Sequence, residues 1–230
     1  MIKKDTLCII PARSGSKGIK NKNIIKFRSY PLLKYSIDFA NKLKFVKKII
    51  LSTDSQKYLN ISKKYLVTTD KLRPKSLSKD NTKTIDVVRF EYLRLKDNKI
   101  KKILILQPTC PFRKINDFYK ANKAINKGYE SAITINKVTE YPQRMLIKNK
   151  NNLFVPYLKN TELFIPRQKI YDIYIRSGSM YFFHIKNLKK KNFLGNKIFT
   201  IETFGKYMLN IDSYKDIIIA KHYFNENYKN

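Results

Sequence analysis

The chain has 230 residues, of which 43% are hydrophobic and 29% are charged, and its formal net charge is +32 at pH 7. This length and composition predict one large globular domain, and no apolar run approaches the roughly 20 residues that cross a bilayer, so we expect a soluble cytoplasmic protein without a membrane partner. Cys8 and Cys110 are the only cysteines, and two isolated thiols in apolar stretches exclude a disulfide framework.

Short β-branched stretches alternate with helical patterns up to Asn136. The pattern predicts strands over 6–12, 47–54, 65–69, 102–109 and 131–136. Helices are predicted over 31–43 and 55–65, from about Thr84, and near 115–127. Such alternation is typical of an α/β fold with three layers, in which helices cover both faces of a mostly parallel central sheet. Ligands bind such sheets at the carboxyl ends of the strands.

The alternation stops beyond Asn136. Residues 138–176 contain three prolines and short apolar runs such as NLFVPYL and ELFIP, which predict a β-rich arm inserted into a single domain that spans residues 1–230. Further strands are predicted over 179–185 and 197–203, and a last helix from about Ser213.

The large positive charge raises the hypothesis of a nucleic-acid-binding protein, for which the 14 Phe and 16 Tyr residues would offer stacking surfaces. Two features argue against it. The basic residues are mostly lysines spread from end to end, and the longest run is Lys189–Lys191. Many aromatic residues also lie in apolar strand patterns such as MYFF rather than beside basic residues. We therefore expect solvated lysine-rich faces and no nucleic-acid partner.

Basic residues gather around a flexible turn directly after the first predicted strand. Arg13, Lys17 and Lys22 surround the turn Ser-Gly-Ser-Lys-Gly, and residues 9–24 contain no carboxylate. Backbone N–H groups in such a turn can converge on an anion, which suits a triphosphate or pyrophosphate. The spacing fits neither the Walker loop nor the GxGxxG dinucleotide fingerprint. From the residues alone, a phosphate site and a basic surface turn both remain open.

The stretch IPARSGSKGIKNKN (10–23) resembles the signature of the acylneuraminate cytidylyltransferase family, the CMP-sialic acid synthetases and their bacterial CMP-nonulosonate relatives. The segment LQPTCPFR (106–113) is similar to the family's LQPTSPLR. Four further segments match in the same order along the chain: IILSTDS (49–55), LRPKSLSKDNT (72–82), PRQKIYDIYIRSGSMYF (166–182) and NIDSYKDIIIAK (210–221). The resemblance implies a Rossmann-like nucleotidyltransferase fold.

The resemblance also implies a reaction. The anomeric hydroxyl of a nonulosonic acid attacks the α-phosphorus of CTP and expels pyrophosphate, so catalysis is mainly positioning and electrostatic stabilisation. The implied catalytic residues are Lys22, Arg13 and Asp212. The implied nucleotide-binding residues are Arg13, Ser16, Lys17, Asn23, Arg73, Thr82 and Thr84.

For the acceptor, the resemblance implies sugar-binding residues Gln107, Arg144, Arg167 and Tyr181, with Arg167 preferred as the partner of the sugar carboxylate. It implies Mg²⁺ as the cofactor, held by Asp212 and Asn210, because hard oxygen ligands suit that ion. It also implies a homodimer whose inserted arm reaches the partner's sugar pocket.

Several of these residues have simpler explanations. Lys22 could be a solvated lysine, and Gln107 could bond only to loop backbone. Tyr181 could be an ordinary strand residue, whereas Asp80 could contact the nucleotide or cap a helix, and Asp212 could cap the last helix. Arg113 is predicted to be structural, through a pair with a nearby acid.

The sequence departs from the family pattern at three places. Asn210 replaces the first aspartate of a pair, which puts the metal site in doubt and leaves a non-catalytic homologue open. Residues Thr139 to Pro142 replace a His-His-Pro-like segment, and Ser177 replaces an asparagine. Both of the latter lie where the sugar is recognised, so pseudaminate and octulosonate remain alternative acceptors.

Overall fold

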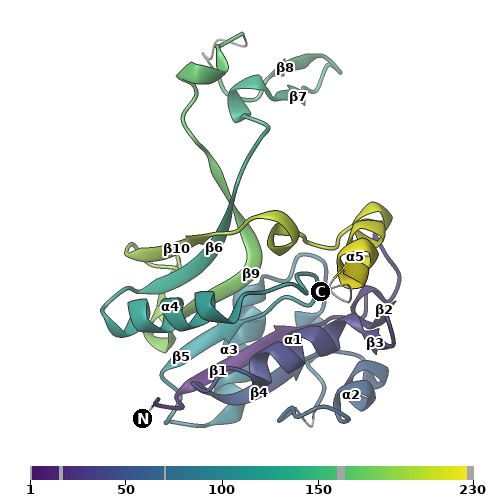
Figure 1. The fold of residues 1–230 in the computed structure, drawn as a ribbon, viewed down its shortest axis with the longest axis vertical. Coiled ribbons are helices and arrows are strands. Elements are labelled where there is room, and N and C mark those ends of the chain that lie inside the picture. The colour runs from purple at the N-terminus through teal and green to yellow at the C-terminus, as the bar shows by residue number, and fades with distance from the viewer. Residues whose placement is uncertain (1, 16–17, 70, 160–163, 227–230) are drawn as a thin grey trace.

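The computed structural model describes residues 2–15, 18–69, 71–159, 164–226. A six-stranded sheet forms its centre, with the strand order β10-β6-β9-β5-β1-β4 (Figure 1). These strands are β1 (Thr6–Pro11), β4 (Val46–Ser52), β5 (Lys102–Ile105), β6 (Ser131–Lys137), β9 (Tyr174–His184) and β10 (Ile198–Glu202). β1 pairs in parallel with β4 and β5, and β10 pairs in parallel with β6.

Five α-helices are present in the described ranges: α1 (Leu32–Asn41), α2 (Gln56–Ser62), α3 (Thr84–Leu95), α4 (Ile115–Asn126) and α5 (Tyr214–Glu226). Two short strands, β2 (Lys26–Phe27) and β3 (Tyr30–Pro31), form a small antiparallel ribbon before α1. The three-layer α/β prediction is therefore confirmed. None of the helices in these ranges combines the length and apolar character that crossing a bilayer requires.

Alternate residues of β1 face the two helical layers, as a strand buried on both faces requires. Cys8 and Ile10 belong to a core cluster that includes residues of α1 and α4. Leu7 and Ile9 belong to a second cluster, which includes Val88 of α3. The two clusters hold the sheet between helices, and its strand ends are left open at one edge.

One predicted strand is wrong and another differs in direction. Residues 65–69 form no strand, because this segment makes two isolated bonds to β4, from Thr68 N to Ile49 O (2.7 Å) and from Leu51 N to the Thr69 hydroxyl (2.6 Å). β9 starts at Tyr174, inside the stretch expected to be arm, and runs antiparallel between β5 and β6. The sheet is therefore mixed.

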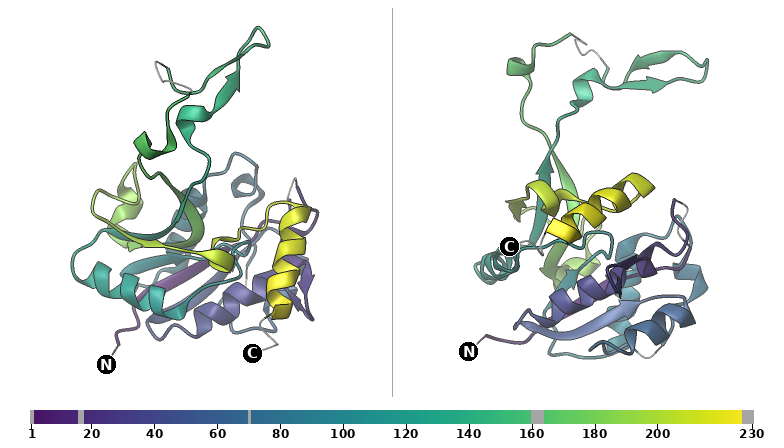
Figure 2. Two further views of the ribbon diagram at one scale, coloured as in Figure 1. Left: turned by 45° about the horizontal axis from the view of Figure 1, so that its top comes forward. Right: turned by 45° about the vertical axis from the view of Figure 1, so that its right-hand side comes forward.

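Residues 138–173 form an arm that projects from the body of the molecule (Figures 1 and 2). β6 and β9 continue beyond the sheet as its base, where Lys137 pairs with Tyr174 in the strand ladder. Further out lies a hairpin of β7 (Leu146–Lys148) and β8 (Phe154–Pro156). The described part of the arm contains this two-stranded hairpin, and the division of the chain into one domain with an inserted β-rich arm stays a prediction.

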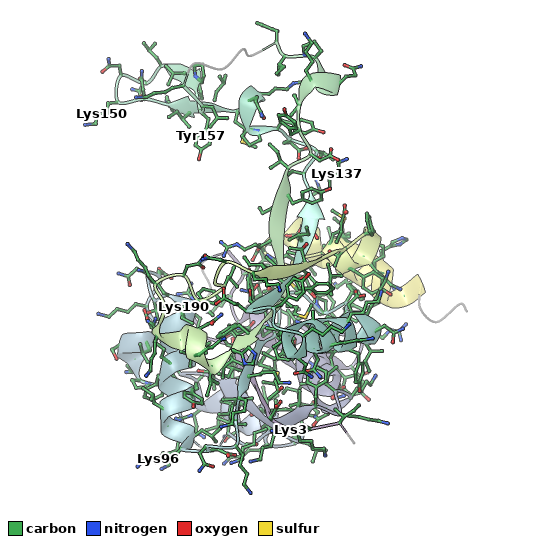
Figure 3. The ribbon with its side chains drawn as sticks, turned by 90° about the vertical axis from the view of Figure 1, so that its left-hand side faces the viewer. Lys3, Lys96, Lys137, Lys150, Tyr157 and Lys190 are labelled. Carbon is green, nitrogen blue, oxygen red and sulfur yellow. The ribbon has the colours of Figure 1, made fainter. Side chains whose placement is uncertain are left out.

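Lysines project from many sides of the molecule. In Figure 3, Lys3, Lys96 and Lys190 lie at well-separated places on the body, and Lys150 lies on the arm. The expectation of solvated lysine-rich faces stays a prediction.

Candidate functional site

A cavity of about 520 Å³ lies at the carboxyl-end edge of the sheet. Four chain segments meet there: the loop that follows β1, the segment before α3, the turn after β5 and the segment before α5. Nine of the predicted site residues line the cavity, namely Arg13, Lys22, Asn23, Arg73, Thr82, Thr84, Gln107, Asn210 and Asp212. Ser16 and Lys17 lie outside the described residues.

Hydrogen bonds to neighbouring elements shape the loop after β1. The Asn23 amide donates to the Arg13 carbonyl (3.1 Å), and Asn23 is itself buried. Ser14 donates through its backbone N–H (2.8 Å) and its hydroxyl (2.9 Å) to the Asp54 carboxylate, which follows β4. These contacts fix the peptide bond between Arg13 and Ser14, so the Arg13 side chain reaches the cavity from a supported backbone.

Sequence reasoning missed the role of Asp54, although the residue lies in the quoted segment IILSTDS. The available signal was a carboxylate at the carboxyl end of a buried strand. Thr109 was missed as well: it lines the cavity, and its carbonyl accepts from Ile211 N (2.8 Å), which joins the turn after β5 to the segment before α5.

Arg13 forms an ion pair with Asp80, with 2.7 Å between a guanidinium nitrogen and a carboxylate oxygen. Asp80 lies in the turn before α3 and also lines the cavity. The N-cap residue of α3 is Lys83, and no side chain caps this helix start by a hydrogen bond. The helix-cap interpretation of Asp80 is therefore wrong.

Lys22 and Asp212 face each other across the cavity. The Lys22 ammonium donates to Asp212 Oδ1 (2.8 Å), and the Lys22 side chain is only 16% exposed. Lys22 is therefore not one more solvated surface lysine. A Cβ at Gly18 would come within 2.9 Å of the Asp212 carbonyl oxygen, so the loop after β1 packs tightly on the segment that carries Asp212.

The start of α5 is stabilised by residues other than the Asp212 side chain. Asp216 Oδ2 accepts from the backbone N–H groups of Ser213 (2.7 Å) and Asp212 (3.0 Å). In return, the Ser213 hydroxyl accepts from Asp216 N (3.4 Å), which is a reciprocal capping arrangement. The interpretation of Asp212 as the helix cap is therefore wrong, and its carboxylate lines the cavity instead.

Asn210 lies beside Asp212 and bonds to it through its side-chain amide, whose nitrogen donates to Asp212 Oδ2. Its amide oxygen accepts from the thiol of Cys110 (3.5 Å). Burial raises the pKa of Cys110 to about 11, which keeps this thiol protonated as a donor near neutral pH.

These donors fit a divalent ion with a single carboxylate anchor. Within the described ranges, no group of three or more His, Cys, Asp or Glu side chains could hold a metal ion. Asp212 is 62% exposed and supplies one carboxylate, while the Asn210 amide oxygen accepts from the Cys110 thiol. Mg²⁺ accepts such a sparse oxygen set when phosphate and water supply the other ligands.

Arg73 lies buried in the wall of the cavity. Its backbone N–H donates to Thr53 O (2.7 Å), and its Nε donates to the Ser78 hydroxyl (3.0 Å). Burial lowers the pKa of this guanidinium, and the nearby Asp54 and Glu91 carboxylates oppose the shift. Arg73 is thus fixed in position, as a residue that orients a ligand must be.

Gln107 presents its side chain to the cavity at the turn after β5. Gly178 has a φ of +80°, and a Cβ there would overlap the Gln107 side-chain oxygen, so this glycine makes room for the glutamine. The Gln107 carbonyl accepts from Arg113 (2.7 Å), a half-buried residue that also donates to Ser36 Oγ and to the Ser179 carbonyl (both 3.1 Å).

Arg113 is structural, as predicted, but the predicted partner is wrong. Its hydrogen bonds in the described structure go to backbone carbonyls and a hydroxyl rather than to an acid. Burial lowers its pKa to about 10. The long-range partners of this guanidinium could not be foreseen from the local sequence.

Among the residues whose side chains the structure describes, the predicted sugar-binding residues Arg144 and Tyr181 do not line the cavity. Arg144 lies on the arm and donates to the Ile165 carbonyl (2.9 Å), and Arg167 lies on the arm in a short 3-10 helix, Arg167–Lys169. Tyr181 lies in β9 opposite Ile105 and Ile133 and packs against the second core cluster. Burial raises the pKa of Tyr181, as expected for a phenol inside a sheet.

The sequence is similar to a known protein family and to several of its members. A model of the cytidylyltransferase family matches residues 7–221. The N-acylneuraminate cytidylyltransferase of Escherichia coli O18:K1:H7 is 48% identical over 52 residues, which are 23% of this chain and 12% of that protein. The CMP-N,N'-diacetyllegionaminic acid synthase of Legionella pneumophila is 28% identical over 209 residues, 89% of this chain and 86% of that protein. The pseudaminic acid cytidylyltransferase of Campylobacter jejuni is 28% identical over 149 residues, 64% of each chain.

Solved structures resemble the fold over almost the whole chain. The structure of CMP:2-keto-3-deoxy-manno-octonic acid synthetase complexed with CTP has a TM-score of 0.71 at 12% identity, covering 96% of this chain and 99% of that one. A 4-diphosphocytidyl-2C-methyl-D-erythritol synthase from Anaerococcus prevotii has a TM-score of 0.66 at 17% identity, covering 96% of both chains. At such low identity these two likenesses establish the shared fold alone.

Proposed function

Because the chain belongs to the cytidylyltransferase family, we propose that it joins CTP to a nonulosonic acid, giving the CMP-sugar and pyrophosphate. One observation carries the proposal: a single cavity gathers Arg13, Lys22, Arg73 and Asp212 from three segments that are far apart in the sequence. The names of relatives that act on acylneuraminic, legionaminic and pseudaminic acids support an acceptor of this class.

Each cavity residue has a distinct part in the proposed reaction. Arg13 binds the triphosphate, and Lys22 lies where it can stabilise negative charge that grows on the α-phosphate as the bond to the sugar oxygen forms. Arg73, Thr82 and Thr84 face the base and ribose, and Gln107 faces the acceptor. Asp212 and Asn210 would hold Mg²⁺, which neutralises phosphate charge when bound.

The test of this function is pyrophosphate release from CTP with a panel of acceptor acids. The panel contains N-acetylneuraminate, legionaminate, pseudaminate and an octulosonate, each with Mg²⁺. We expect release with one or more nonulosonic acids, with the CMP-sugar identified by mass spectrometry. Absence of release with every acid would contradict the proposal, and release with the octulosonate alone would replace its acceptor class.

We predict that the cavity prefers CTP over UTP, ATP and GTP. In the proposed site Arg73, which its bonds to Thr53 and Ser78 hold in place, and Thr82 face the base, and a purine or an unmatched exocyclic group leaves a donor unpaired. The expected preference is at least about 10-fold in Kd, the worth of one net hydrogen bond to a fixed partner. Thermal shift measurements with the four nucleotides check this, and equal protection by all four would refute it.

We also propose a homodimer in which the arm contributes to the partner's sugar pocket. The arm exposes many large apolar side chains, including Leu146 (50% exposed), Phe154 (70%) and Phe164 (92%), and such a surface favours burial against a partner. Arg144 and Arg167 lie on this arm, away from the cavity, so a second copy is the simplest way to bring an arginine to the sugar carboxylate.

Gel filtration with light scattering tests the dimer. We expect the wild-type protein to be a dimer, and Leu146→Asp with Phe154→Asp to raise the dimer dissociation constant by about 100-fold, because two buried apolar contacts are lost. Leu93→Asp is the matched control, since Leu93 is also 70% exposed but lies on α3 of the body. A stable, fully active wild-type monomer would end the proposal for the arm.

A further inference from the structure

We infer that Asp80 is a specificity-determining residue that competes with the phosphates of the ligand for Arg13. The Asp80 carboxylate holds the Arg13 guanidinium in the structure, and a polyphosphate would replace it there. This inference rests on the proposed function, because it assigns the exchange to the triphosphate of CTP.

The geometry places Asp80 as a substitute anion. Arg13 and Asp80 belong to two segments that are 67 residues apart, and both side chains line the same cavity. Lys22, Arg73 and Lys79 line it as well, so the carboxylate stands among four cations that would otherwise face an anionic ligand. A phosphate group that bound to these cations would therefore have to take the place of the Asp80 carboxylate.

The contact is suited to exchange. It joins one guanidinium nitrogen to one carboxylate oxygen, whereas a guanidinium can hold a phosphate through two parallel bonds. The side chains of Arg13 and Asp80 are 34% and 48% exposed, and ion pairs at such exposure contribute little to stability. A triphosphate brings several charges to the same place, so it displaces the carboxylate with a net gain.

The backbone at Arg13 is held in place, whereas Asp80 lies in a turn that can move. The backbone around Arg13 is bonded to Asn23 and Asp54, as described above, and stays in place when the guanidinium changes partner. Asp80 lies in a turn between residues 79 and 82, outside any helix or strand. The turn can therefore move without breaking α3.

Selectivity follows from this exchange. A ligand that engages Arg13 must first replace the Asp80 carboxylate, so weakly charged anions gain little from entering. A nucleoside without phosphates does not contest the pair at all. Removing the Asp80 charge should therefore strengthen polyphosphate binding and leave nucleoside binding unchanged.

The experiment is calorimetric titration of wild-type protein and Asp80→Asn with CTP, tripolyphosphate and cytidine, with and without Mg²⁺. We expect Asp80→Asn to bind CTP and tripolyphosphate about 3- to 10-fold more tightly, because a partly screened competing charge is gone. Cytidine affinity should stay within about twofold, and the gain should shrink at high salt. Asp80→Glu keeps the charge and should behave as wild type.

Two controls isolate the pair. Asp38→Asn removes the same charge from α1, away from the cavity, where Asp38 pairs with Lys34, and it should leave binding unchanged. In an Arg13→Gln background the gain from Asp80→Asn should shrink, because the contested guanidinium is absent while the other cavity cations remain.

The outcomes separate the two proposals. Weaker or unchanged polyphosphate binding in Asp80→Asn overturns the inference, and weaker binding would mean that the ion pair instead closes over the ligand. If wild-type protein binds tripolyphosphate but not CTP, the proposed function fails. The replacement of Asp80 by a polyphosphate at Arg13 can still be tested with tripolyphosphate and Asp80→Asn. If it binds neither, the inference fails as well.

Discussion

Lys22→Ala should lower kcat by about 100- to 1000-fold while CTP affinity changes only a few fold, since a charge that acts on the transition state affects turnover more than binding. Charge grows on the α-phosphate oxygens as the sugar oxygen attacks, and the Lys22 ammonium is the compact cation nearest to Asp212 in the cavity. In the ligand-free protein Asp212 holds this ammonium, which keeps it pointed into the site.

Steady-state kinetics and CTP titration of the same variant check this expectation. Lys20→Ala is the control, because Lys20 is an exposed lysine two residues away that does not line the cavity. Turnover near the wild-type rate in Lys22→Ala would remove Lys22 from the catalytic residues. A large loss of CTP affinity with unchanged kcat would instead make Lys22 a ground-state binding residue.

Asp212→Asn should reduce turnover by about 100-fold or more, because it removes the carboxylate of the proposed Mg²⁺ site. Asn210→Asp should instead be active and should lower the Mg²⁺ concentration for half-maximal rate by about 3- to 10-fold, since ligand charge raises metal affinity. In Asn210→Asp two carboxylates would lie side by side and repel each other. The rate of this variant without Mg²⁺ should therefore fall further below its rate with Mg²⁺ than in the wild-type protein.

Magnesium titrations of rate and of CTP-dependent thermal protection test both variants. Asp216→Asn is the structural control: Asp216 accepts the N–H groups at the start of α5, so its loss should lower stability by about 0.5–2 kcal/mol without changing the Mg²⁺ dependence. Unchanged rate and Mg²⁺ dependence in Asp212→Asn would end its assignment as a metal ligand.

The sequence predicts the layers of this fold well because each central strand is buried on two faces. Alternate residues of β1 enter two different core clusters, and this burial makes Thr6–Pro11 an uninterrupted apolar run. Strand direction is not contained in such a run. The second half of the antiparallel β9, MYFF, is as apolar as β5, and nothing local indicates its reversed direction.

Among the site residues, too, some were predicted from the sequence and others were not. Arg13, Lys22 and Asp212 were predicted because they lie in segments that resemble a family, and the structure brings them to one cavity. The partners that orient the site were not predicted. Asp54 with Ser14, Asp80 with Arg13 and Arg113 with Ser36 join positions 40, 67 and 77 residues apart, and no short pattern specifies such pairs.

The packing of α5 against the loop after β1 has a consequence for the order in which the site is assembled. Ile217 and Phe224 of α5 share a core cluster with Ile19 and Phe27, and Lys22 meets Asp212 across 190 positions of sequence. During synthesis the loop after β1 leaves the ribosome early. Its apolar side chains are covered by α5 only after residues beyond position 210 have been made. Until then Ile19 and Phe27 have no α5 to bury them and are open to chaperones and to wrong associations. The nascent chain thus acquires its catalytic cavity only as the last of these segments leaves the exit tunnel.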